Sequence, residues 1–320
     1  MNEFINALKQ KDLEKIKLCP KSDLHNHFAL GGSRRYLKQL TGVEIKPVKA
    51  PLSSMEEMHT WNRINMGETF NGTAMRKVLI RAAFQQARED GITVLEIGED
   101  VWGLGEFFHN DIQELIEAFT TAQRELAPDT ELRLQVGLSR HCPIDYLENC
   151  LSYFWGNKAF YSIDLYGDEF AQPISNFKGI YRRAKKEGLR LKAHVGEWGT
   201  AEDVRIAVEE LELDEVQHGI AAIQDESVVR FLADNHIRLN ITPTSNVLLG
   251  RVSSISSHPI SQLYRSGVDV TINSDDVLIF DSDVSKEYLR LYEAGCLSAE
   301  ELDNIRRAGL EPVYRGSELG

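Results

Sequence analysis

Several features are scarce or missing in this sequence of 320 residues, and each absence excludes a class of protein. Only four cysteines occur, and none lies in a C-x-x-C pair, which argues against a disulfide framework and a thiolate zinc site. No apolar run approaches the ~18 residues of a membrane helix, and the charged N-terminus is unlike a signal peptide. We therefore expect a cytoplasmic protein with reduced cysteines and no membrane partner.

Positive charge is also in short supply, because 36 Lys and Arg face 49 Asp and Glu, a net charge of −13. Such a chain repels phosphate backbones, so we expect no nucleic-acid partner. The 42% hydrophobic and 27% charged fractions are typical of globular proteins rather than disordered or fibrous ones. The length suits one large α/β domain or two smaller ones, and the oligomeric state stays open.

Common catalytic motifs are absent as well. The sequence has no H-E-x-x-H, no G-x-x-x-x-G-K-[ST] and no complete dinucleotide fingerprint, since Gly103-Leu-Gly105 lacks a third glycine. The H-x-E and P-C-x-x-C signature of thiolate-zinc deaminases is missing too. Helical zinc proteases, P-loop enzymes and nucleotide dehydrogenases are therefore not indicated.

Short β-branched runs do recur along the chain, each followed by a segment with helical periodicity. Asp90-Gly91, Glu187-Gly188 and Ser266-Gly267 each stand just before such a run, as expected where a helix ends. Eight strand–helix units favour a closed (β/α)8 TIM barrel, within one domain over residues 1–320, over an open sheet. The predicted strands are Ser22–Phe28, Ile92–Gly98, Leu132–Leu138, Ser162–Gly167, Leu189–His194, Glu215–Gly219, Ile237–Ile241 and Val268–Asn273.

The regular spacing is broken between the first and second strands, where residues 43–73 form an insertion. Loops that follow the strands of a barrel emerge at its C-terminal mouth. We interpret this segment as a helical lid or pocket wall, with a solvated loop as the alternative.

Polar residues cluster at the predicted strand ends. His25 and His27 share one face of the first strand by alternation and can bind one cation together. A barrel directs its strand ends toward a common centre, so His194 and Asp275 can complete the site. Three imidazoles and a carboxylate suit one Zn²⁺ per chain, with Fe²⁺ or Mn²⁺ as alternatives. A lone H-x-H is often accidental, but four histidines at three strand ends, His218 among them, are a much less common coincidence.

These pieces together resemble the adenosine deaminase family of the amidohydrolase superfamily, whose members are TIM barrels with one zinc ion that hydrolyse an exocyclic amine of a purine. The resemblance spans about residues 20 to 310. The matching motifs are Asp23-Leu-His-Asn-His27, Asp164-Leu-Tyr-Gly-Asp-Glu169, His194-Val-Gly-Glu197, Gln217-His-Gly219, Pro243-Thr-Ser-Asn246 and Asn273-Ser-Asp-Asp276.

The resemblance implies a role for each matched position. The zinc ligands would be His25, His27, His194 and Asp275. Glu197 would donate a proton to ring N1, and His218, with Asp275, would position and deprotonate the metal-activated water. Asp276 and the backbone N–H of Gly167 would bind ring N7 and N3. Glu197 suits its role only if burial raises its pKa.

One departure concerns the sugar side of the substrate. Ala29 stands where adenosine deaminases carry a ribose-contacting acidic residue, and Val277 replaces a frequent proline. Arg34 and Arg35 follow, and we consider two interpretations: a clamp for an anionic substrate group, or solvated charges on a helix.

The sequence therefore predicts a zinc-dependent hydrolase that converts an adenine- or adenosine-like purine to the 6-oxo product and ammonia. The alternatives are a deaminase of another aminated heterocycle or of an anionic adenosine derivative, and a catalytically silent barrel that binds a nucleoside.

Overall fold

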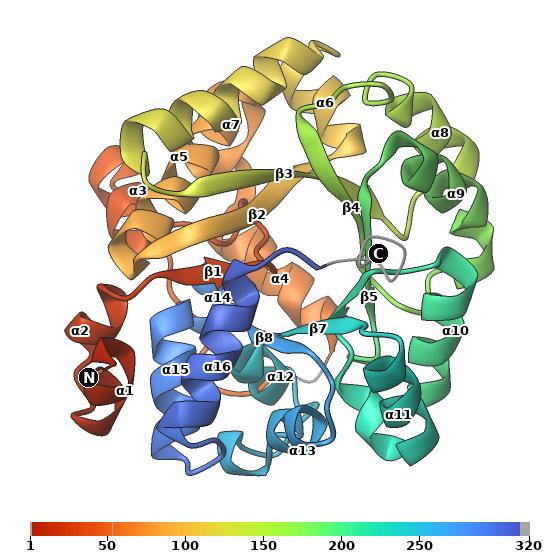
Figure 1. The fold of residues 1–320 in the computed structure, drawn as a ribbon. Coiled ribbons are helices and arrows are strands. Elements are labelled where there is room, and N and C mark those ends of the chain that lie inside the picture. The colour runs from red at the N-terminus through yellow and green to blue at the C-terminus, as the bar shows by residue number, and fades with distance from the viewer. Residues whose placement is uncertain (1, 53, 314–320) are drawn as a thin grey trace.

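The computed structural model describes residues 2–52 and 54–313 and contains eight parallel strands in a ring (Figure 1). Each strand pairs with the next in sequence order, and an Asn26–Asp275 bridge links the two end strands. The predicted TIM barrel is therefore confirmed as a nearly closed barrel. The strands are β1 (Lys21–Asp23), β2 (Ile92–Asp100), β3 (Glu131–Ser139), β4 (Phe160–Tyr166), β5 (Arg190–Val195), β6 (Glu215–His218), β7 (Arg238–Ile241) and β8 (Val270–Ile272).

Alternation along the strands separates apolar and polar side chains. On β4, Ile163 and Leu165 join the hydrophobic core, whereas Asp164 contacts His194 of β5 inside the barrel. On β5, Leu191 likewise belongs to the core. The interior of the barrel is consequently polar toward the mouth, which places reactive groups where the strands end.

Helices follow the strands and form the outer ring. Gly91 and Gly188 end two of them with left-handed backbone (φ 67° and 87°), as predicted from the sequence. The helices that follow β1 to β4 are α3 (Arg34–Thr41), α4 (Met55–Asn65), η1 (Gly67–Phe70), α5 (Gly72–Asp90), α6 (Val101–Phe108), α7 (Ile112–Leu126), α8 (Ile144–Leu151), η2 (Ile174–Phe177) and α9 (Lys178–Glu187). Those of the second half are α10 (Ala201–Leu211), η3 (Ile220–Gln224), α11 (Glu226–Asp234), α12 (Pro243–Leu248), η4 (Ile255–Ser257), α13 (Ile260–Arg265), α14 (Val277–Phe280), α15 (Val284–Glu293) and α16 (Ala299–Leu310).

Both terminal segments pack beside the β1–β8 junction. The N-terminal helices α1 (Glu3–Lys9) and α2 (Leu13–Lys17) contact α15 and α16, and α16 also contacts β1 and β8. An edge-to-face contact of Phe4 with Tyr288, 5.2 Å between ring centroids, fastens α1 to α15. The junction between β1 and β8 is thus covered by helices from both ends of the chain.

The first strand differs from its prediction. β1 ends at Asp23 rather than Phe28, and the chain after it leaves the regular ladder. The backbone carbonyl of His25 accepts a hydrogen bond from the N–H of Asp275 at 2.9 Å, so closure of the barrel bends this segment across the mouth. Strand alternation therefore does not orient His25 and His27.

All four cysteines are free thiols. Among the described residues, no helix combines the length and the apolar character that crossing a bilayer requires.

Candidate metal centre and active site

A cavity of about 600 Å³ opens at the C-terminal ends of the strands. Its inner wall comes from the segments that follow the strands, and its outer wall comes from the insertion between β1 and β2. The predicted site residues that line it are His27, Gly167, His194, Glu197, His218, Asp275 and Asp276.

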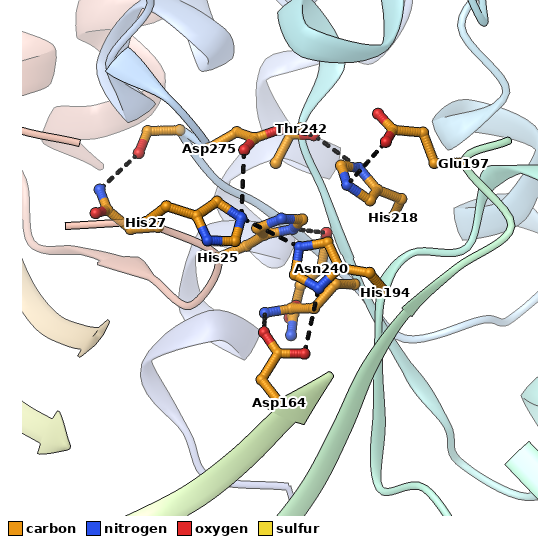
Figure 2. A network of polar contacts seen from close by, with 12 residues as sticks. His25, His27, Asp164, His194, Glu197, His218, Asn240, Thr242 and Asp275 are labelled. Atoms are coloured by element: carbon orange, nitrogen blue, oxygen red, sulfur yellow. Dashed lines mark hydrogen bonds and ion pairs between the residues drawn. The ribbon is translucent and has the colours of Figure 1, made fainter. Parts of the chain in front are cut away.

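Three imidazoles and a carboxylate converge at the base of this cavity (Figure 2). Nε2 of His27 lies 3.2 Å from Nε2 of His194 and 3.7 Å from Oδ1 of Asp275. His25 contacts Asn240 O through Nδ1 at 2.9 Å, whereas its buried Nε2 has no hydrogen-bond partner among the described residues. Ligand atoms of His25, His27 and Asp275 all lie within 4.8 Å of one another.

This cluster fits a metal ion chemically. Burial and the neighbouring imidazoles hold the pKa of His25 well below its usual value, and burial also lowers the pKa of His27. Both rings are therefore neutral at pH 7, the form that binds metals. The partnerless Nε2 of His25 would be a costly orphan in a site built only for the fold.

Outer contacts orient these ligands. Asp164 Oδ1 lies 3.2 Å from Nδ1 of His194, and the amides of Gln135 and Gln217 donate to Asp164 Oδ2 at 3.3 and 3.2 Å. Burial works to raise the pKa of Asp164, but the charge and hydrogen bond of His194 prevail, so its pKa lies below the usual value. A charged carboxylate behind a metal-binding imidazole directs Nε2 toward the ion and increases its basicity.

Glu197 stands beside this cluster on the turn that follows β5. Burial, with the charges of Asp275 and Glu169, raises the pKa of Glu197 well above its usual value. The Glu169 carboxylate holds the turn by accepting the N–H groups of Gly196 at 2.8 Å, Glu197 at 2.9 Å and Trp198 at 2.7 Å. Burial thus favours the protonated form of Glu197, and the bonded turn holds its backbone in place.

His218 faces Glu197 across the cavity. Its Nε2 lies 3.5 Å from Oε2 of Glu197, and its Nδ1 lies 3.1 Å from Oγ1 of Thr242. Burial and the charges of His194 and His27 hold the pKa of His218 well below its usual value, so the ring is neutral. His218 and Asp275 both have left-handed backbone, at φ 65° and 61°, a strained conformation that clusters at functional sites.

Asp276 is a second carboxyl whose buried environment favours the protonated form. Its buried Oδ1 has no hydrogen-bond partner among the described residues, and burial with the charges of Asp275 and Glu197 raises its pKa well above the usual value. Gly167 lies on the opposite wall with φ 99°, and a Cβ there would meet His141 at 3.0 Å. Only glycine therefore brings its backbone so close to the cavity at this point.

The insertion forms one wall of the cavity. The helix α4 and the turn η1 contribute His59, Asn62 and Arg63 as well as the apolar Met66 and Phe70. Backbone bonds from Val48 N–H to Ile279 O (2.9 Å) and from Leu52 N–H to Leu248 O (2.6 Å) fasten the segment to the loops after β8 and β7. Residue 53 of the predicted 43–73 insertion lies outside the described residues.

Arg34 and Arg35 do not line this cavity. Arg34 binds Asp281 Oδ1 at 2.7 Å and the backbone carbonyls of Val277 and Leu278. Arg35 pairs with Glu89 at 2.5 Å on the surface. The geometry therefore gives the anion-clamp hypothesis no support and assigns Arg34 to bracing the loop after Asp276.

Sequence reasoning missed several residues that shape the site. Asp164, Glu169 and Asn246 stand in the matched motifs, which was a usable signal. Asn246 Nδ2 donates to Glu197 Oε1 at 3.3 Å. Arg76 and Glu99, a buried ion pair on the cavity wall, carry no motif, because their partners come from α5 and β2.

Comparisons with known proteins agree with this geometry. Residues 72–316 match the family described as adenosine deaminase. A putative adenosine/adenine deaminase of Treponema pallidum is 32% identical over 303 residues, which cover 92% of this chain and 100% of that protein. An adenine deaminase of Rhodopseudomonas palustris is 28% identical over 323 residues, covering 96% and 93%.

Solved structures show the same fold at lower identity. The adenine deaminase of Arthrobacter aurescens superposes with a TM-score of 0.76 at 23% identity, covering 91% of this chain and 92% of that one. An amidohydrolase of Burkholderia ambifaria with bound zinc gives 0.79 at 17% identity, covering 99% and 90%. The N6-methyl-AMP deaminase of Arabidopsis thaliana gives 0.76 at 18% identity, covering 95% of each chain.

Proposed function

Because this chain belongs to the adenosine deaminase family, a family of metal-dependent hydrolases, we propose that it hydrolytically deaminates an adenine-like purine. Water adds to C6, the C6–N bond to the exocyclic amine breaks, and ammonia and the 6-oxo purine leave. One observation carries this proposal: Glu197 and Asp276, whose pKa values are raised well above the usual range, share a cavity with His218 and a cluster of potential metal ligands.

We assign the metal to His25, His27, His194 and Asp275, and we propose zinc. A set of three nitrogen donors and one oxygen donor is the borderline type that zinc accepts, with iron and manganese as alternatives. Zinc held by these residues would activate a water molecule for attack at neutral pH. The zinc-bound Burkholderia amidohydrolase supports this assignment.

Glu197 is the proton donor to the ring. Attack at C6 places electron density on N1, and a carboxylic acid beside that nitrogen transfers its proton there. The raised pKa keeps Glu197 protonated until the ring needs the proton. The proton that His218 takes from the water then passes to the exocyclic amine, which leaves as ammonia, and the Glu197 carboxylate regains a proton as the 6-oxo group forms.

His218 takes the proton of the attacking water together with Asp275. Its pKa is low enough for the ring to be neutral before the reaction, and its Nε2 faces Glu197 at 3.5 Å. Thr242 Oγ1 lies 3.1 Å from Nδ1 of His218 and 3.4 Å from Oδ2 of Asp275, so one hydroxyl ties the two proton acceptors together.

The purine ring is held by groups on opposite walls. A protonated Asp276 donates through its free side-chain oxygen to N7, and Gly167 donates its backbone N–H to N3. Acceptor nitrogens on both edges of the ring are thereby matched by donors. A pyrimidine lacks this arrangement, so the ligand class is a purine or a similar fused heterocycle.

The sugar side is more permissive. Ala29 lines the cavity without offering a hydrogen bond, and the ~600 Å³ volume falls within the range of sites for drug-sized ligands, more room than a bare base needs. Relatives are named for activity on adenine, adenosine and N6-methyl-AMP, and these names span this choice. We therefore propose adenine or adenosine as substrate, with a modified adenosine as the alternative.

The test is ammonia release from a panel of purine bases, nucleosides, nucleotides and pterins, with metal content measured on the same protein. We expect about one equivalent of zinc and activity on at least one 6-aminopurine. Less than half an equivalent of any divalent metal after metal-replete expression would refute the metal site. Activity on pterins alone would refute the purine assignment.

A further inference from the structure

Trp198 immediately follows Glu197 and has no role in the mechanism proposed above. Its indole Nε1 donates a hydrogen bond to Oε2 of Glu197 at 3.0 Å. An indole N–H donates and never accepts, so the direction of this bond is unambiguous. It is also shorter than the 3.3 Å bond from Asn246 to the other carboxyl oxygen.

The indole ring is itself held in place from several sides. The backbone N–H of Trp198 donates to Glu169 Oε1 at 2.7 Å, and the Arg251 guanidinium lies 3.9 Å from the ring centroid. Arg251 in turn donates from Nε to Leu249 O at 2.9 Å. The ring also packs against the small apolar cluster formed by Leu249, Ile279 and Phe280.

A fixed donor at this position matters most after the proton has moved. When Glu197 gives its proton to the ring, a carboxylate forms in a buried place that already holds the charge of Asp275. A buried carboxylate without donors is costly, and hydrogen bonds to charged acceptors are stronger than those to neutral ones. The Trp198 N–H therefore stabilises the state after proton transfer more than the state before it.

We propose that Trp198 is a positioning residue for the deamination, whose indole N–H directs the Glu197 carboxyl at the ring and stabilises its carboxylate after proton transfer. This inference rests on the proposed function, because it assigns Trp198 to the step in which Glu197 is the acid. Arg251 assists by keeping the indole plane in place.

The first experiment compares Trp198→Phe with Trp155→Phe by steady-state kinetics of ammonia release. Trp155 is the matched control, since it also lies under a guanidinium, that of Arg183 at 4.8 Å, but stands just before β4, at the end of the barrel opposite to Glu197. We expect W198F to lower kcat roughly 10- to 100-fold with KM changed less than about 3-fold, because the lost bond acts on the transition state. W155F should keep both constants.

The second experiment places W198F in an E197Q background. If Trp198 acts through Glu197, the second substitution lowers the residual kcat by less than about 2-fold. A role limited to folding would instead multiply the two losses. Arg251→Met, which keeps an apolar stem beside the ring, should lower kcat about 2- to 5-fold in the same direction.

Thermal midpoints separate these effects from unfolding, and R251M keeps the test open if W198F is unstable. A wild-type kcat in both W198F and R251M, or full multiplication of the losses in the E197Q background, overturns this inference alone. A wild-type protein without deaminase activity on any aminated heterocycle overturns the proposed function and this inference with it.

Discussion

The barrel interior contains two polar clusters that differ in how their charges are balanced. The inner cluster, made of Lys192, Glu96 and Glu215, places one cation between two carboxylates. Lys192 Nζ lies 3.0 Å from Glu96 Oε1 and donates to Leu24 O at 2.7 Å. Burial acts to lower the pKa of Lys192, but the two carboxylates prevail and raise it, and Lys192 helps to lower the pKa of Glu215 despite burial.

The mouth cluster has acids and neutral imidazoles but no cation of its own. Its members are His25, His27, His194, Glu197, His218, Asp275 and Asp276. The pKa values of Glu197 and Asp276 are raised well above their usual range, chiefly by burial. Nε2 of His25 and Oδ1 of Asp276 lack hydrogen-bond partners among the described residues. Oε2 of Glu96 also lacks a hydrogen-bond partner among the described residues, but the Glu96 carboxyl is paired with Lys192. The inner cluster thus contains its own cation and serves the fold, whereas we propose that the mouth cluster is completed by a metal ion and a substrate.

The largest effect should follow from removing the acid of the mouth cluster. Glu197→Gln keeps the shape but removes the proton donor, so we expect kcat to fall by roughly 10³-fold or more. The fold should be retained, because an amide costs less to bury than a carboxyl that ionises. Ammonia release and thermal midpoint measure the two quantities, with Glu226→Gln on the exposed face of α11 as control. Near-normal turnover in E197Q would show that Glu197 is not the acid.

A substitution in the inner cluster should affect the stability of the fold rather than the catalytic step. Lys192→Met leaves Glu96 and Glu215 buried without their cation, and we expect a loss of about 3–5 kcal/mol in the free energy of unfolding. Urea denaturation measures it, with the exposed Lys185→Met as the matched control. A loss below about 1 kcal/mol in K192M would erase the distinction between the two clusters.

The pH dependence of stability tests the effect of burial on Asp100, a carboxyl on the cavity wall. Burial raises the pKa of Asp100 from 3.8 to about 7, so the folded state binds a proton that the unfolded state releases. The associated stability is fully present below about pH 4 and is lost as the pH rises through about 7. Asp100→Asn removes this dependence, and its stability relative to wild type should rise by up to about 4 kcal/mol between pH 4 and 8.

The control for this series is Asp111→Asn at the exposed cap of α7, which reports the cost of an amide at a helix cap. Urea midpoints at each pH give the values. A difference between wild type and D100N that stays constant from pH 4 to 8 would contradict the burial effect.

The smallest effects are expected at Arg34 and Arg35. The surface pair of Arg35 with Glu89 should contribute little to stability because it is screened by solvent, and R35A should leave kcat/KM nearly unchanged. R34A loosens the loop after Asp276 and should lower activity on neutral and anionic substrates equally. Kinetics with adenosine and AMP compare the two, and a selective loss with AMP would reinstate the anion clamp.

Prediction from the sequence was accurate where a local pattern carried the signal. All eight predicted strands are present and each is followed by helical segments, because burial of a strand and of a helix face leaves a distinct period. It was wrong for the end of β1, where pairing with the loop after β8 bends the chain at His25. No local pattern records a contact between residues 250 positions apart.

The sequence by itself determined the barrel and the set of chemical groups at its mouth, because strand periodicity and residue type are local properties. The tertiary structure alone decided that the pKa values of Glu197 and Asp276 are raised, since both depend on burial and on the charge of Asp275. It also decided that Arg34 faces Asp281 rather than the cavity. Electrostatic environment and side-chain direction arise only when distant segments pack together, so these properties belong to the fold.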